Sequence, residues 1–327
     1  MPPNIKNEYQ GTVEDPRTED QKAEDYKYEN LARGDVPLNW IEYGEKNLKS
    51  FPIQNQDSSS SCVAQGTSKI LAMHEVKEGR GYTQLCPKFI YTRRANYPEG
   101  GMWLQNSLSI ACKYGSCLES FIPCDDKNEE FMNSQSEPAG AEPNALNYRG
   151  KYYFEITGGI TKIAEVMEQG YGVLLGFRFD YEEWVDVPFI ASNKPVGELK
   201  VGHGVAAVDY CLWDGKRALV IEDSWGPYYG KGGRRIITED FLNARCFYAG
   251  YITSLPNYVF EKTLHKGSKG IDVRKLQEKL NTQGYILTVD GKFGNLTQLA
   301  VMNFQRKHGL KDDGVVGRLT NQVLNSL

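Results

Sequence analysis

Two side chains in this 327-residue sequence, Cys62 and His203, have the types and surroundings that nucleophilic chemistry needs. Cys62 follows a polar stretch, residues 56–61, and opens a segment whose apolar residues recur at helical spacing. A thiol at a helix N-terminus meets the positive end of the helix dipole and unpaired N–H groups, and both favour the reactive thiolate. The alternative is a buried structural cysteine, which is the usual role of a cysteine in a helix.

His203 is the histidine best placed to act as the base. Of the four histidines, His74 lies along the helix that Cys62 opens, while His265 and His308 belong to the C-terminal region. His203 instead begins an apolar strand, directly after a glycine. An imidazole on a strand that faces a thiol at a helix start is the arrangement used in Cys–His catalysis.

Asp223 and Trp225 end the next apolar strand and are candidates for supporting roles. Asp223 could accept a hydrogen bond from the second ring nitrogen of His203 and so fix its tautomer. Trp225 could shield that hydrogen bond from water. Taken one at a time, a turn aspartate and a core tryptophan are the simpler interpretations.

The elements that must position these residues are helices first and strands later. Helical spacing runs from Val63 to Val76, and a second helix is predicted over residues 104–113. Strand-like apolar runs then occupy residues 172–177, 204–208 and 218–221. This order predicts an α+β fold whose two halves meet at a cleft.

The two ends of the chain differ from this central region. Residues 1–35 hold five Lys or Arg against nine Asp or Glu, and we expect an acidic extension without its own core. It would lie on the central domain as a strap, or in its cleft as a short propeptide. Residues 259–327 hold eleven basic and six acidic residues, which suits an anionic polymer such as a bacterial wall. The predicted domains are therefore 1–35, 36–258 and 259–327.

Three short amphipathic helices are predicted in the C-terminal region. Val273, Leu276 and Leu280 would share one helix face, and Thr297 and Thr320 are candidate N-caps of the next two helices. Two similar Asp-Gly turns, 290–294 and 313–317, precede these threonines, with glycines for tight loops.

Composition excludes several classes of protein. A net charge of only −4 argues against nucleic-acid binding, and no run approaches the length of a membrane helix. The N-terminus has no Sec signal peptide, so we expect synthesis in the cytoplasm and action at the wall after release or another export route. No CxxC pair occurs, which argues against a structural zinc site, and we expect no metal or other cofactor. We expect mostly reduced thiols among the seven cysteines, Cys62, Cys86, Cys112, Cys117, Cys124, Cys211 and Cys246.

Several segments resemble the papain family of cysteine peptidases, over about residues 36–254. Gln56 precedes Cys62 by six residues, as the family's oxyanion-hole glutamine precedes its nucleophile. The other matching segments are 36–40, 99–103, 202–208 and 223–233. The resemblance implies a two-lobe catalytic domain with a helical lobe and a β-barrel-like lobe. It also implies that Gly100 and Gly101 bind the substrate backbone, with Ser61 and Trp225 beside them.

The sequence departs from the family pattern at three positions. Val63 and Ser59 replace a tryptophan and a disulfide cysteine, so that disulfide cannot form. Asp223 stands where the family has asparagine. An anion at this position should hold the imidazolium more strongly and raise its pKa. The alternative is that Asp223 only orients the ring.

The C-terminal region resembles the small all-α, three-helix peptidoglycan-binding domain of many wall hydrolases. The resemblance leaves the ligand contacts open, and the loop with Asp290, Gly291, Phe293 and Thr297 is the best candidate, although Phe293 also suits a core position. Together the two resemblances predict a monomeric endopeptidase that cleaves peptidoglycan cross-links or wall-associated protein, with a phage endolysin as one setting. The alternatives are a general protease with wall anchoring only and a non-catalytic wall-binding protein. A metal-dependent amidase would need clustered ligands, which the catalytic region lacks.

Overall fold

The computed structural model describes residues 11–22, 36–123, 126–180, 184, 199, 201–254 and 263–326. The chain forms two compact units, Met1–Pro16 with Val36–Leu255, and Arg17–Asp35 with Pro256–Leu327. The predicted boundary near residue 258 lies close to this division. The start of the acidic extension, however, belongs with the first unit rather than forming a part of its own.

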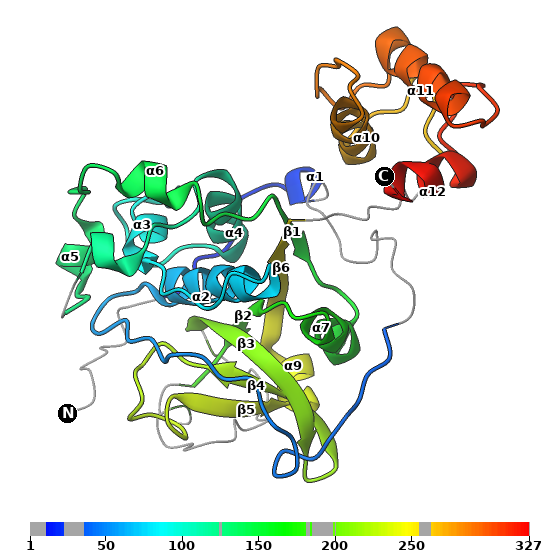
Figure 1. The fold of residues 1–327 in the computed structure, drawn as a ribbon. Coiled ribbons are helices and arrows are strands. Elements are labelled where there is room, and N and C mark those ends of the chain that lie inside the picture. Colours follow the sequence, from blue (N-terminus) through cyan, green and yellow to red (C-terminus); the bar gives the residue numbers. More distant parts are fainter. Residues whose placement is uncertain are drawn as a thin grey trace. The chain divides into compact units, whose positions relative to one another are not determined.

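Helices form one half of the first unit (Figure 1). Their bounds are α2 (Cys62–Lys77), α3 (Pro87–Tyr91), α4 (Leu104–Lys113), η2 (Glu119–Phe121), α5 (Glu129–Asn133) and α6 (Ala141–Ala145). α2 begins at Cys62 and α4 spans residues 104–113, both as predicted. The first fourteen residues of α2 are all buried because this helix lies between the other helices and the sheet.

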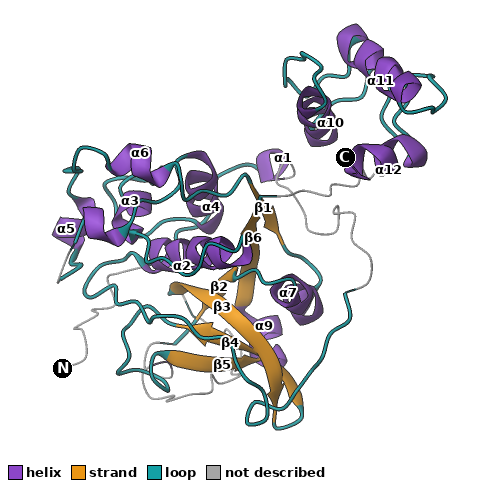
Figure 2. Cartoon of the chain, viewed as in Figure 1, coloured by secondary structure: helices purple, strands orange, loops and turns teal. Residues whose placement is uncertain are grey.

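A six-stranded antiparallel sheet forms the other half (Figure 2). Its strand order is β1-β6-β2-β3-β4-β5. The strands are β1 (Tyr152–Glu155), β2 (Val173–Arg178), β3 (Gly202–Trp213), β4 (Lys216–Glu222), β5 (Arg234–Thr238) and β6 (Cys246–Thr253), joined in part through α7 (Gly159–Glu168) and α9 (Glu239–Arg245). The predicted strands match β2, β3 and β4. Among the described strands, β1 and β5 are the sheet edges, and this antiparallel sheet is the β lobe that the resemblance implied.

Two glycines let α2 approach the sheet closely. A Cβ on Gly66 of α2 would lie 2.8 Å from Leu174 Cδ1 of β2, and one on Gly204 of β3 would lie 3.1 Å from Val63 Cα. On the opposite face of β2, Phe177 packs against Phe241 of α9. The first turn of α2 therefore lies directly against the start of β3, which is where Cys62 and His203 are found.

The C-terminal unit contains α10 (Ile271–Thr282), α11 (Asn295–Lys307) and α12 (Arg318–Ser326), and α1 (Glu19–Lys22) also belongs to this unit. Val273, Leu276 and Leu280 are buried on one face of α10, as predicted. The predicted N-caps are wrong, because Gly294 caps α11 and the two threonines are each the third residue of their helix. Their hydroxyl groups have another role, which is described below.

Six of the described cysteines are not joined in disulfides: Cys62, Cys86, Cys112, Cys117, Cys211 and Cys246. Cys124 lies outside the described residues. Among the described residues, no helix is long and apolar enough to cross a membrane, and no cluster of three or more His, Cys, Asp or Glu could hold a metal ion.

Candidate active site

Cys62 and His203 meet where α2 and β3 begin. The Cys62 thiol interacts electrostatically with the His203 ring, and the backbone N–H of Gly204, the next residue, donates to Sγ over 3.4 Å. Both side chains are buried, at 0% and 3% exposure. The structure thus brings together the two residues that the sequence analysis singled out as nucleophile and base.

Asp223 holds the other side of the imidazole. Its Oδ1 lies 2.9 Å from His203 Nε2 and accepts a 2.8 Å hydrogen bond from the Ser224 backbone N–H. Its Oδ2 accepts hydrogen bonds from Trp184 Nε1 at 2.8 Å and from Arg235 Nε at 3.2 Å. With Nε2 engaged in this way, Nδ1 is left for the sulfur.

Arg235 and Trp184 are site residues that the sequence analysis missed. Arg235 is fully buried on β5, and its guanidinium lies 4.6 Å from the centre of the Trp184 ring. Arg235 lies twelve residues beyond Asp223, on the neighbouring strand. No local motif connects the two, because only the pairing of β4 with β5 brings the guanidinium to the carboxylate.

Charge at this site favours a protonated imidazole. Burial opposes protonation of His203, but the negative charges of Asp223 and Cys62 outweigh it and raise the pKa of His203 to about 10. Burial would raise the pKa of Asp223, but His203 and Arg235 hold that pKa well below its usual range. The predicted anion at position 223 is therefore present, with a buried guanidinium as a second cationic partner.

Aromatic rings enclose the His203–Asp223 pair. The Trp225 and Phe179 ring centroids each lie 5.4 Å from that of His203. Trp184 covers the ring from another side, at 6.0 Å. Trp225 is thus positioned to shield the hydrogen bond, and it shares this position with two aromatic residues that precede β3.

Gln56 lies beside the nucleophile and is held at both ends of its amide. Nε2 donates to the Ser59 carbonyl over 2.7 Å, and Oε1 accepts from the Ser224 hydroxyl over 2.6 Å. An amide nitrogen carries two protons, so one donor remains after the bond to Ser59. Ser61 was expected to contact substrate, but its hydroxyl is buried between Ser59 Oγ and Gln65 Nε2.

The backbone of Gly101 is hydrogen-bonded within the protein, and the expected contacts of the glycine pair with substrate stay a prediction. The Gly101 N–H donates to Tyr91 Oη over 2.9 Å, and its carbonyl accepts from Asn96 Nδ2, so both backbone groups are used within the protein. Gly100 is exposed, and its carbonyl accepts from Asn96 Nδ2 over 3.4 Å. The next residue, Met102, is the one whose N–H and carbonyl pair with an extended segment beside the site.

The Glu129 carboxylate joins two parts of this region by hydrogen bonds. It accepts hydrogen bonds from the Ser60 backbone N–H at 2.7 Å and from Tyr91 Oη at 2.8 Å. It therefore connects the loop before Cys62 with the turn at Gly101. The sequence analysis did not single out Glu129.

The extended segment beside Met102 is the N-terminal strap, residues 11–16. The Val13 N–H donates to the Met102 carbonyl over 3.1 Å, and the Met102 N–H donates to the Gly11 carbonyl over 3.3 Å. A Cβ on Gly11 would lie 2.2 Å from Cys62 Sγ, so this backbone covers the thiol. The predicted strap is thus found at residues 11–16, while residues 1–10 and 23–35 lie outside the described residues.

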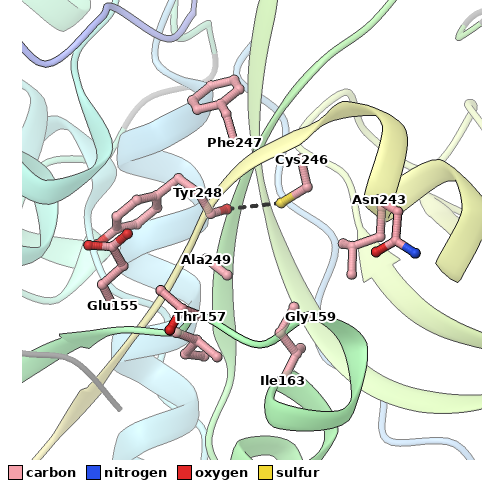
Figure 3. A pocket seen from close by; sticks show the side chains of 11 residues that line it. Glu155, Thr157, Gly159, Ile163, Asn243, Cys246, Phe247, Tyr248 and Ala249 are labelled. Carbon is pink, nitrogen blue, oxygen red and sulfur yellow. Dashed lines mark hydrogen bonds between the residues drawn. The ribbon is translucent and has the colours of Figure 1, made fainter. Parts of the chain in front are cut away.

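A separate pocket of about 270 Å³ lies between the ends of β1 and β6 and the helices α7 and α9 (Figure 3). Its lining includes Glu155, Ile163, Asn243 and Cys246 but none of the four candidate catalytic residues. Burial raises the pKa of the Cys246 thiol to about 11, and Sγ donates to the Tyr248 carbonyl over 3.2 Å. The Cys246 thiol is therefore protonated near neutral pH, which makes Cys246 a poorer candidate nucleophile than Cys62.

The predicted wall-binding loop is held by hydrogen bonds within the C-terminal unit. Gln277 Nε2 donates to Asp290 Oδ1, the Lys292 carbonyl and Thr297 Oγ1, while its Oε1 accepts from the Gly291 N–H. Phe293 is buried, at 2% exposure. Gln305 repeats the pattern with Asp313, Val315, Thr320 and Gly314. The side chains of Asp290, Phe293 and Thr297 thus hold this loop together, and their contact with wall ligands stays a prediction.

Solved structures share the fold of this chain. Xylellain, a cysteine protease from Xylella fastidiosa, matches with a TM-score of 0.61 at 19% identity, covering 76% of this chain and 97% of that one. Digestive procathepsin L 3 from Tenebrio molitor larval midgut matches with a TM-score of 0.53 at 16% identity, covering 70% and 76%. The predicted papain-like fold is confirmed, and at these identities the similarity concerns the fold alone.

Residues 269–324 match the family model described as "Putative peptidoglycan binding domain". The spore cortex-lytic enzyme of Bacillus cereus is 44% identical over 64 residues, which are 19% of this chain and 25% of that protein. The zinc D-Ala-D-Ala carboxypeptidase of Streptomyces albus G is 41% identical over 68 residues, 19% and 26% of the two chains. The chain therefore spans about a quarter of the length of these relatives, and the predicted C-terminal domain is confirmed.

Proposed function

We propose that this chain is a cysteine endopeptidase that cleaves peptide bonds at bacterial cell walls, where its C-terminal domain holds it. The observation that carries the proposal is the placement of Cys62, His203 and Asp223 together at the junction of α2 and β3, with Sγ bonded to the Gly204 N–H and Asp223 Oδ1 2.9 Å from His203 Nε2. The papain-like fold and the peptidoglycan-binding match of residues 269–324 support the two halves of the proposal.

In the proposed reaction, the Cys62 thiolate attacks the carbonyl carbon of the scissile peptide bond. The free N–H of Gln56 Nε2 and the Cys62 backbone N–H donate to the oxyanion that forms. The His203 imidazolium gives its proton to the leaving amine, which leaves a thioester on Cys62. The neutral imidazole then takes a proton from water, and the hydroxide attacks the thioester carbon. The C–S bond breaks, the carboxylic acid product leaves, and the Cys62 thiolate and His203 imidazolium are restored. Asp223 keeps the ring oriented throughout.

The wall is the proposed place of action because of the C-terminal domain and the names of its relatives. A spore cortex-lytic enzyme and a D-Ala-D-Ala carboxypeptidase carry similar segments. A tethered catalytic domain acts at a raised local concentration of substrate, so that modest affinity of the domain gives a large gain in rate. Peptidoglycan cross-links are the proposed substrate, and a phage-type endolysin is the setting in which such cleavage would lyse cells.

A second candidate is a general protease that is only anchored at the wall. The papain-like fold favours it, since the fold neighbours are proteases of protein substrates by name. Purified peptidoglycan and casein should therefore be compared as substrates of the full chain. Release of wall peptides, identified by mass spectrometry, with little casein cleavage supports the proposal, and the reverse supports the general protease.

The Cys62→Ala variant is the control for both substrates. It should bind walls as the unchanged chain does and release nothing. Wall binding without cleavage by the unchanged chain would make this a non-catalytic wall-binding protein and overturn the enzyme proposal.

A further inference from the structure

Arg178 of β2 lies next to Phe177, the residue that pairs with His203 of β3. The register of β2 with β3 pairs Phe177 with His203 and Arg178 with Gly202. Gly202 in turn lies against Thr12, since a Cβ there would be 1.6 Å from Thr12 Oγ1. The Arg178 side chain therefore begins beside the N-terminal strap.

A β-bulge places an aromatic ring beside this guanidinium. Gly176 pairs with Tyr248 and Phe177 pairs with Cys246, so Phe247 is the extra residue on β6. Its side chain points away from that of Cys246 (Figure 3) and is 48% exposed. The Arg178 guanidinium carbon lies 5.5 Å from the centre of the Phe247 ring. A bulge that turns a large apolar side chain toward a charged group is a feature that local folding alone does not require.

Because Gly176 has no side chain, Leu104 and Phe247 can fill the space above it and form a small apolar floor. A Cβ on Gly176 would lie 2.7 Å from Leu104 Cδ1 and 3.0 Å from Phe247 Cε2. Leu104 follows Met102, the residue that pairs with the strap, by two positions. Leu104 and Phe247 thus meet above Gly176, with the cation of Arg178 at the side.

An occupant of this place is present in the chain itself. Glu14 of the N-terminal strap puts its Oε1 at 3.0 Å from Arg178 Nη2. The Glu14 side chain is 88% exposed and that of Arg178 is 28% exposed. The pair is open to solvent, so another carboxylate can exchange with Glu14, and an exposed pair of this kind is weak enough to exchange readily.

We propose that Arg178, Phe247 and Leu104 form a subsite that selects a carboxylate on the wall peptide near the cleaved bond. This rests on the proposed function. The apolar floor takes the aliphatic part of an acidic residue, and the guanidinium takes its carboxylate. Glu14 occupies the subsite when the strap covers Cys62, and the acidic wall peptide replaces it when the strap leaves.

The test uses the full chain and pairs of quenched fluorescent wall-type peptides that differ only in Glu against Gln at one position, scanned around the cleaved bond. The strap competes equally with both members of a pair, so the ratio of their kcat/KM values reports the subsite alone. At one position we expect the Glu peptide to be favoured on the order of fivefold, the range of an exposed ion pair.

Arg178→Gln should bring that ratio close to one, Arg178→Glu should reverse it, and Arg178→Lys should keep most of it. Arg217→Gln is the matched control, because Arg217 also pairs with a glutamate, Glu239, and lies over an aromatic ring, that of Trp40. It should leave the ratio unchanged.

A ratio near one at every position, or one that Arg178→Gln does not alter, overturns the subsite while cleavage itself continues. The absence of any Cys62-dependent cleavage instead overturns the proposed function, and the subsite with it. Amidation of the carboxylates of purified peptidoglycan should slow its digestion by the unchanged chain and leave that by Arg178→Gln nearly unaffected.

Discussion

The backbone of Gly11 lies against the sulfur of Cys62 so closely that a Cβ on Gly11 would be 2.2 Å from Sγ. The Gly11 carbonyl accepts from the Met102 N–H and is therefore turned toward that residue. The strap thus covers the thiol, while the Gly11 carbonyl is held by its hydrogen bond from Met102. This relationship makes the strap an obstacle to substrate.

Gly11→Ala should accordingly activate the chain. The added methyl group cannot share the space of the sulfur, so the strap must leave. We expect the rates of Cys62 alkylation and of peptide cleavage to rise roughly tenfold, which corresponds to about 1.4 kcal/mol of weakened strap binding. Gly44→Ala is the matched control, since a Cβ there meets nothing within 4 Å. Equal alkylation rates for the two variants would contradict a covering role for the strap.

The pH dependence should report the raised pKa of His203. The imidazolium is the form that protonates the leaving amine, so the basic limb of the kcat/KM profile should fall near pH 10. Because folding raises this pKa above 6.5, the protonated ring stabilises the fold fully below pH 6.5, and this contribution is lost as pH rises through about 10. Unfolding free energy measured in urea at several pH values checks the same pKa independently.

Asp223→Asn should move the basic limb of that profile downward by roughly one to two pH units, since an opposite charge beside the ring is removed. The substitution also leaves the buried Arg235 without its carboxylate, which costs about 3–5 kcal/mol of stability. The double variant with Arg235→Met removes both charges. It should regain part of the stability and keep the shifted limb. An unmoved limb would mean that Asp223 only orients the ring.

A buried ion pair should dominate the stability of the first unit next to this site. Lys69 of α2 lies 2.6 Å from Glu222 of β4, with side-chain exposures of 1% and 0%. Glu222→Gln should cost about 3–5 kcal/mol because it leaves the ammonium buried and unpaired. Lys69→Met should cost less, since Arg234 still pairs with Glu222 at 2.9 Å.

Denaturant unfolding of both Glu222 and Lys69 variants measures this order. Lys216→Met breaks the exposed pair with Asp240 and serves as the control, with an expected loss below about 1 kcal/mol. If Glu222→Gln lowers the free energy of unfolding as little as the control does, the predicted contribution of the buried pair to stability is contradicted.

The C-terminal unit should depend on Gln277. Gln277→Glu removes the donors to Asp290 and Thr297 and places a second carboxylate beside Asp290. We expect this unit to unfold at lower temperature and wall binding to fall, while cleavage of a soluble peptide is unchanged. Gln283→Glu, at the end of α10, is the control and should preserve wall binding. Loss of soluble-peptide cleavage in Gln277→Glu would contradict the independence of the two activities.

The sequence by itself determined the local elements and singled out the residues proposed to carry the chemistry. Helical spacing after Cys62, the apolar strand after His203 and the three C-terminal helices are short-range patterns, because each follows from the period of one element. The motifs that contain Gln56, Cys62 and His203 can likewise be recognised in the sequence alone.

Only the tertiary structure decided which distant groups complete the site. Arg235 reaches Asp223 through the pairing of two strands, and Glu129 reaches Ser60 across 69 residues. The hydrogen bond from the Gly101 N–H to Tyr91 and the pairing of Met102 with the N-terminal strap are two more contacts of this kind. Hydrogen bonds of this kind depend on how elements pack, and packing between elements far apart in the chain leaves no periodic trace in the sequence.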